Sequence, residues 1–114
     1  MSRKYDLFLN DILNEINFIK ETTKNLELNN FKKDDTKIRA VTKSLEIIGE
    51  AVSNIPQEIK EKYNEIEWRK IKGFRDIATH QYWSVDLDYE WYIIKNKLDI
   101  LKKQIKEIKT KEKL

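Results

Sequence analysis

The side chains best suited to chemistry lie in one short segment, GFRDIATHQYW, at residues 73–83. His80 is the only histidine of the chain, and it follows Arg75 by five residues and precedes Tyr82 by two. An imidazole can move protons near neutral pH, and a guanidinium can donate two hydrogen bonds to one phosphate group. If a cleft brought His80 and Arg75 together, the histidine could withdraw a 2′-hydroxyl proton from RNA while the arginine stabilised the attacked phosphate. Such chemistry needs no metal, cofactor or protein nucleophile.

Helical geometry sets a condition on this pair. An α-helix turns by about 100° per residue, so Arg75 and Thr79 would share a face, whereas His80 would lie about 140° from Arg75. The two side chains can meet if the helix ends or unwinds near Thr79, where HQYWS changes the pattern. They can also meet if two copies of the segment face each other across a dimer axis.

Structural roles are the more common outcome for residues of these types. A histidine near a helix end usually bonds to a carbonyl, and an arginine on a helix usually pairs with a carboxylate, here Glu50 or Asp76. Asp76 could also orient Arg75 or His80. Tyr82 is most simply a packed aromatic. Spacing alone therefore leaves both catalysis and a purely structural role open.

Hydrophobic stripes predict the helices that carry this segment, because apolar residues recur at alternating intervals of three and four. The stripes are Leu9, Ile12, Ile16, Ile19, Thr23 and Leu26; Ile38, Val41, Leu45, Ile48, Val52 and Ile55; Trp68, Ile71, Arg75 and Ala78; and Leu87, Trp91, Ile94, Leu98, Leu101, Ile105 and Ile108. They predict long helices over about 5–26, 38–54, 68–79 and 87–108, with a short helix from Pro56 to Tyr63. Asp34 or Asp35 is the expected N-cap of the second helix, and Ser84 or Asp86 that of the last.

Composition favours one all-α domain over residues 1–114. The chain is 39% hydrophobic and 38% charged, and Gly49, Gly73 and Pro56 are its only strong helix breakers. We expect an antiparallel bundle of four long helices and one short helix. The absence of cysteine excludes disulfides and thiolate sites, and a single histidine excludes multi-histidine metal sites, so no metal or cofactor is expected. No apolar run approaches the roughly 20 residues of a membrane span, and we expect no membrane partner and a cytoplasmic location.

Two surface features suggest partners. Residues 95–114 hold eight lysines against three carboxylates, so this tail could attract nucleic acid, although lysines at a helix end also complement the helix dipole. Tyr89, Trp91 and Tyr92 give the last helix more than one apolar side. That surplus favours self-association, unless these aromatics fill one crowded core.

The motif at Arg75, His80 and Tyr82 resembles the RxxxxHxY signature of HEPN-domain ribonucleases, specifically the HepT-like toxins of type VII toxin–antitoxin systems. Three longer stretches agree in order with that family. RAVTKSLEIIGEAVSNIP (39–56) resembles its second helix, WRKIKGFRDIATHQY (68–82) its motif block, and VDLDYEWYII (85–94) the start of its last helix.

The resemblance implies a homodimeric helical bundle in which Arg75 and His80 of both copies line a cleft at the dimer axis and cleave RNA, with tRNA and mRNA as candidate substrates. It also implies a cognate minimal nucleotidyltransferase as antitoxin, which transfers AMP from ATP to Tyr82. Asp76 and Thr79 depart from the family, where Asn and an aliphatic residue are common, and we expect both to influence substrate choice and rate.

Two alternatives remain. The chain could be a non-catalytic HEPN-type module that docks a nucleotidyltransferase or a nucleotide. It could also be a helical protein that binds RNA through the lysine-rich tail, in which case deletion of residues 102–114 should abolish binding while His80→Ala should not.

Overall fold

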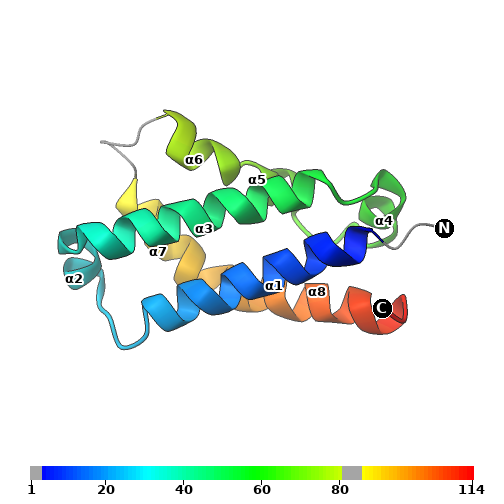
Figure 1. Cartoon of the computed structure of the whole chain (residues 1–114), viewed down its shortest axis with the longest axis horizontal. Helices are drawn as coiled ribbons and strands as arrows, with labels where there is room; N and C mark the ends of the chain where they lie inside the picture. The colour runs from blue at the N-terminus through cyan, green and yellow to red at the C-terminus, as the bar shows by residue number, and fades with distance from the viewer. Residues whose placement is uncertain (1–3, 81–85) are drawn as a thin grey trace.

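The computed structural model describes residues 4–80 and 86–114, with the backbone alone for positions 78–80. Within these ranges all regular secondary structure is helical, which confirms the all-α prediction (Figure 1). The helices are α1 (Tyr5–Thr22), α2 (Leu28–Lys33), α3 (Asp35–Ser53), α4 (Gln57–Lys62), α5 (Trp68–Lys72), α6 (Arg75–His80), α7 (Leu87–Asn96) and α8 (Leu98–Lys111). None of them is long and apolar enough to cross a membrane.

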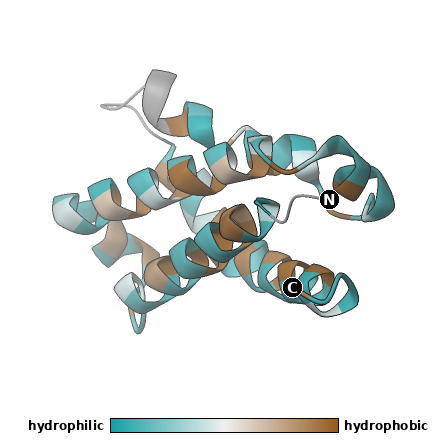
Figure 2. Cartoon of the chain, turned by 45° about the vertical axis from the view of Figure 1, so that its right-hand side comes forward, coloured by the Kyte–Doolittle hydropathy of each residue, from teal (hydrophilic) through white to brown (hydrophobic). Residues whose placement is uncertain are grey.

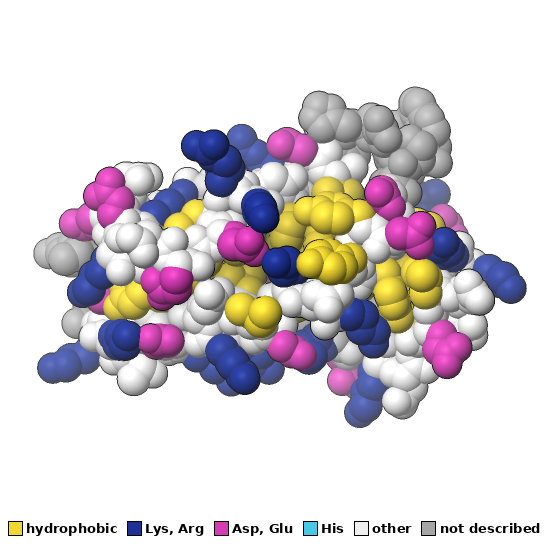
Figure 3. Space-filling view, turned by 180° about the vertical axis from the view of Figure 1, so that it is seen from behind, with side chains coloured by type: hydrophobic (Ala, Val, Ile, Leu, Met, Phe, Trp, Pro, Cys, Tyr) yellow, Lys and Arg dark blue, Asp and Glu magenta, His cyan; other side chains and the backbone are white. Residues whose placement is uncertain are grey.

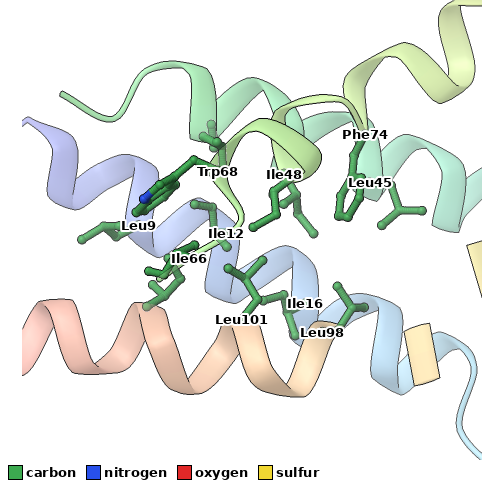
Figure 4. Close-up of a cluster of buried hydrophobic side chains, with 14 of the residues drawn as sticks. Leu9, Ile12, Ile16, Leu45, Ile48, Ile66, Trp68, Phe74, Leu98 and Leu101 are labelled. Carbon is green, nitrogen blue, oxygen red and sulfur yellow. The ribbon is translucent and has the colours of Figure 1, made fainter. Parts of the chain in front are cut away.

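Three long helices form the body of the molecule. Helix α1 packs against α3 on one side and α8 on the other, while α5 and α6 cross the outer side of α3. The hydrophobic sides of the helices face one another (Figure 2). The predicted stripes supply this core: the close-up in Figure 4 shows residues of α1, α3 and α8 meeting Trp68 and Phe74 from the segment that carries the motif.

The first helix is shorter than the predicted 5–26, because it ends at Thr22. The Thr23 hydroxyl donates to the Ile19 carbonyl at 2.9 Å, and Asn25 has a positive φ of 60° that no helix accommodates. The following polar stretch forms α2, which the sequence did not reveal. Its six residues are too few to show a period, yet its Phe31 is fully buried.

The two later long helices are each broken in two. The predicted helix over 68–79 turns at Gly73 and Phe74, where glycine has low helix propensity and Phe74 rotates into the core. The predicted helix over 87–108 breaks at Lys97, whose φ of −117° departs from the helical value. The expectation of four long helices and one short one is therefore wrong.

The predicted helix boundaries around α3 and α7 are largely confirmed. The Asp34 carboxylate accepts a hydrogen bond from the Lys37 N–H at 3.0 Å, and α3 ends before Asn54 as predicted. The Asp86 carboxylate accepts one from the Tyr89 N–H at 3.0 Å. Asp34 and Asp86 are thus the caps; Ser84, the alternative, lies outside the described residues.

The lysine-rich C-terminal segment belongs to the fold rather than to a free tail. Ile105 and Ile108 of α8 are fully buried. The Glu112 carboxylate accepts a hydrogen bond from the Tyr63 hydroxyl at 2.6 Å and lies 2.7 Å from the Lys62 ammonium. Deleting residues 102–114 would therefore remove core side chains, and that deletion cannot isolate a role of the tail in RNA binding.

Candidate active site

Arg75 is held against α3 by the close approach of two backbones. A β-carbon built on Gly49 would lie 2.5 Å from the Arg75 backbone nitrogen and 2.9 Å from the Lys72 carbonyl oxygen. Any side chain at position 49 would push the α5–α6 connection away from α3, since real β-carbons do not approach backbone atoms so closely. The glycine of the IGEA sequence therefore sets where Arg75 stands.

The Arg75 guanidinium lies beside two carboxylates. Its Nη1 is 3.5 Å from an oxygen of Glu50, the residue after that glycine, and its Nε is 4.0 Å from an oxygen of Asp76. This agrees with the pairing expected for a structural arginine. The Arg75 side chain is nevertheless 40% exposed and its partners are more exposed still, so these ion pairs are weak and a phosphate could displace them.

Arg75 lines a groove of about 430 Å³ between α1, α3 and α6. The groove walls also carry the apolar side chains of Phe8 and Ile47. Its charged lining residues are Asp11, Lys43, Glu46, Glu50, Arg75 and Asp76. Four carboxylates thus face two cations, so this groove alone attracts a polyanion poorly. No three His, Cys, Asp or Glu side chains in the described part of the chain are grouped to hold a metal ion.

The described backbone leaves Arg75 and His80 on different sides of their helix. Helix α6 is described as far as His80, one residue beyond Thr79, and residues 81–85 lie outside the described part, so an end of the helix near Thr79 stays a prediction. Positions 75 and 80 are then about 140° apart around the axis. The side chains of Thr79 and His80, and Tyr82 as a whole, lie outside the described residues.

A second groove, of about 260 Å³, opens on the other side of the α5–α6 connection. Phe74 lines this groove, while the next residue, Arg75, lines the first. Tyr89, Tyr92 and Ile100 border it and are each about half exposed. Figure 3, which views the molecule from behind, shows hydrophobic side chains gathered among charged ones on that face. The surplus apolar surface predicted for the last helix is thus present.

Comparison with known proteins identifies the family of this chain. A family model described as "Ribonuclease HepT-like" matches residues 12–108. The chain belongs to the HepT-like ribonuclease family. It is 42% identical to an inferred RNase of Caldanaerobacter subterraneus subsp. tengcongensis, over 93% of this chain and 95% of that protein. It is 35% identical to an inferred ribonuclease HepT of Thermococcus cleftensis, over 96% and 99% of the two chains. No solved structure matches it significantly.

This HepT-like chain also buries a carboxyl group that the sequence did not single out. Glu90 of α7 is fully buried, and one of its oxygens accepts a hydrogen bond from the Thr42 hydroxyl of α3 at 2.7 Å. The other oxygen has no hydrogen-bond partner among the described residues. Burial raises the pKa of Glu90 to about 7, the bond from Thr42 opposes this rise, and the nearby Asp86 carboxylate adds to it. The sequence signal for this burial is the position of Glu90 between two aromatic residues, Tyr89 and Trp91.

Proposed function

We propose that this protein is an endoribonuclease that cleaves RNA by attack of a 2′-hydroxyl on the adjacent phosphorus. Membership of the HepT-like ribonuclease family carries the proposal, and the placement of Arg75 in an open groove supports it. His80 takes the proton of the 2′-hydroxyl. The new bond from the 2′-oxygen to phosphorus forms as the bond to the 5′-oxygen breaks, and the leaving 5′-oxygen takes a proton from water, which leaves a cyclic phosphate and a 5′-hydroxyl. Arg75 stabilises the charge on the phosphoryl oxygens.

The active form in this proposal is a homodimer whose two copies share each site. The angle between positions 75 and 80 around α6 supports sharing, since one unbroken helix would not point both side chains at one phosphate. The second groove described above also supports self-association. Its apolar side chains Tyr89, Tyr92 and Ile100 are exposed beside charges of both signs, which include Glu67 and Lys97. Such a face can complement itself across a two-fold axis.

Regulation in this proposal follows the toxin–antitoxin pattern. A cognate nucleotidyltransferase would join AMP from ATP to the Tyr82 hydroxyl, with release of pyrophosphate and the phenolic proton. The added phosphate and nucleoside would stand two residues from His80 and would exclude RNA by bulk and by charge. Asp76 and Thr79 would influence substrate choice beside the reacting groups.

The test is cleavage of total RNA by the purified protein in EDTA. The wild-type protein should leave 2′,3′-cyclic phosphate ends, and His80→Ala should abolish cleavage. Lys106→Gln, on the exposed surface of α8, is a control that should cut normally. Cleavage by the His80→Ala protein would refute the assignment. Intact-mass spectra with the partner enzyme and ATP should show AMP on the wild-type protein and none on Tyr82→Phe.

A further inference from the structure

A groove of opposite charge lies beside the Arg75 groove, between α4 and α5. Its volume is about 400 Å³, and its charged lining residues are Lys60, Glu61, Arg69 and Lys72. Three cations thus face one carboxylate. We call it the basic groove. The Trp68 indole N–H donates to the Tyr63 carbonyl at 3.0 Å, which fixes the connection between α4 and α5 and holds the two walls together.

The cations of the basic groove have no carboxylate partner in the part of the chain that the structure describes. In residues 4–80 and 86–114, no Asp or Glu forms an ion pair with Lys60, Arg69 or Lys72. The nearby Lys62 and Lys70, by contrast, bind the carboxylates of glutamates at 2.7 and 3.2 Å. The chain therefore neutralises lysines around the groove and leaves those inside it uncompensated.

Two of these cations repel each other. Burial and the positive charge of Lys72 lower the pKa of the Lys60 ammonium. Bringing like charges together opposes folding, and a cluster of this kind is typical of a site that receives an anion.

The position of the basic groove relates it to the candidate active site. Lys72 ends α5, and Arg75 begins α6 after the turn at Gly73 and Phe74. The Lys72 carbonyl and the Arg75 backbone nitrogen both lie against Gly49. A chain of phosphates that reached Arg75 would meet four carboxylates in the Arg75 groove, whereas the basic groove offers cations, of which Lys72 precedes Arg75 by three residues.

We propose that Lys60, Arg69 and Lys72 bind the backbone phosphates of single-stranded RNA next to the phosphate that Arg75 contacts. This inference rests on the proposed ribonuclease function and names where the rest of the substrate lies. The groove supplies affinity, because cations that neutralise phosphates release counterions from the RNA. Arg69 can also hold one phosphate through two parallel hydrogen bonds. The lysine-rich tail, the sequence-based candidate for RNA binding, is instead partly neutralised, since Lys97, Lys109 and Lys111 pair with carboxylates.

The experiment measures binding without cleavage. Every protein carries His80→Ala, and a labelled single-stranded RNA oligonucleotide is titrated by fluorescence anisotropy over a series of salt concentrations. Lys60→Gln, Arg69→Gln and Lys72→Gln should each weaken binding roughly three- to tenfold and lower the slope of log affinity against log salt by about 0.7. Lys106→Gln removes an exposed lysine on α8 and should change neither quantity.

Further measurements separate the possible outcomes. Lys60→Gln should melt no lower than the parent because it relieves repulsion, so its weaker binding would not reflect unfolding. Unchanged affinity in the three groove variants, or an equal loss in Lys106→Gln, would overturn the proposal. So would ATP or inorganic phosphate binding that depends on the groove while RNA binding does not, since that result indicates a free-nucleotide site. Loss of cleavage is scored separately in proteins that keep His80, so the ribonuclease proposal can fail while the groove stands, or the reverse.

Discussion

Gly49 and Arg75 are in direct backbone contact, with room for no atom between them: a β-carbon on Gly49 would lie 2.5 Å from the Arg75 nitrogen. Gly49→Ala should therefore shift the start of α6, lower the free energy of unfolding by about 1–3 kcal/mol, and reduce RNA cleavage beyond the fraction unfolded. Gly73→Ala is the comparison in the same connection: its β-carbon would meet the nearest atom, the Lys70 carbonyl oxygen, at 3.2 Å, a tight contact that a small shift relieves, so we expect a smaller loss. Thermal melts and cleavage rates would decide, and equal activity in the two variants would contradict the role of Gly49.

A shared active site predicts complementation between inactive variants. Arg75→Ala and His80→Ala homodimers should both be inactive, whereas a heterodimer purified through two different tags retains one intact composite site. It should show about half of the wild-type activity per dimer. If Arg75 and His80 act within one copy, the heterodimer has no intact site, and its inactivity would contradict sharing.

The carboxylates beside Arg75 predict tighter RNA binding when one is neutralised. Glu50→Gln removes a charge whose oxygen is 3.5 Å from the guanidinium and that repels an incoming phosphate. The KM for RNA should fall roughly two- to fivefold at low salt and approach the wild-type value at high salt, because exposed charges are screened. Glu21→Gln, at the exposed end of α1, is the control. A KM that rises would instead indicate that Glu50 positions Arg75.

Glu90 predicts that stability falls as pH rises. Its pKa is about 7 in the folded protein, above the ordinary value of 4.5, so its contribution is complete below about pH 4.5 and is lost as pH rises through 7. The shift corresponds to at most about 3.4 kcal/mol. Glu90→Gln mimics the neutral acid and should melt several degrees higher than wild type at pH 8 and similarly at pH 5. Glu21→Gln should leave the difference between the two pH values unchanged, and a wild-type-like difference in Glu90→Gln would contradict the interpretation.

The regular parts of the fold could be predicted from the sequence, because burial imposes a period on long helices. Ile12, Ile16, Leu45 and Ile48 all fall on predicted stripes and all are fully buried. The breaks could not be predicted in the same way. At Lys97 the stripe continues through the break unchanged, since Ile94 and Leu98 keep helical spacing and both are buried.

The candidate site was only partly accessible from the sequence. Arg75, His80 and Tyr82 form a local motif, so their spacing was visible. The contact of Gly49 with Arg75 joins residues far apart in the chain, and it depends on how closely α3 and the α5–α6 connection pack. The basic groove was hidden for a similar reason, because Lys60 precedes a turn that brings it beside Arg69.

The repulsion between Lys60 and Lys72 has a practical consequence for anyone who engineers this protein. A screen for heat resistance would favour replacement of either lysine, since each substitution relieves an unfavourable contact. If the basic groove holds RNA, the most thermostable variants from such a screen would bind RNA most weakly. Selection for activity would then retain lysine at these two positions, whereas selection for thermal stability would replace it.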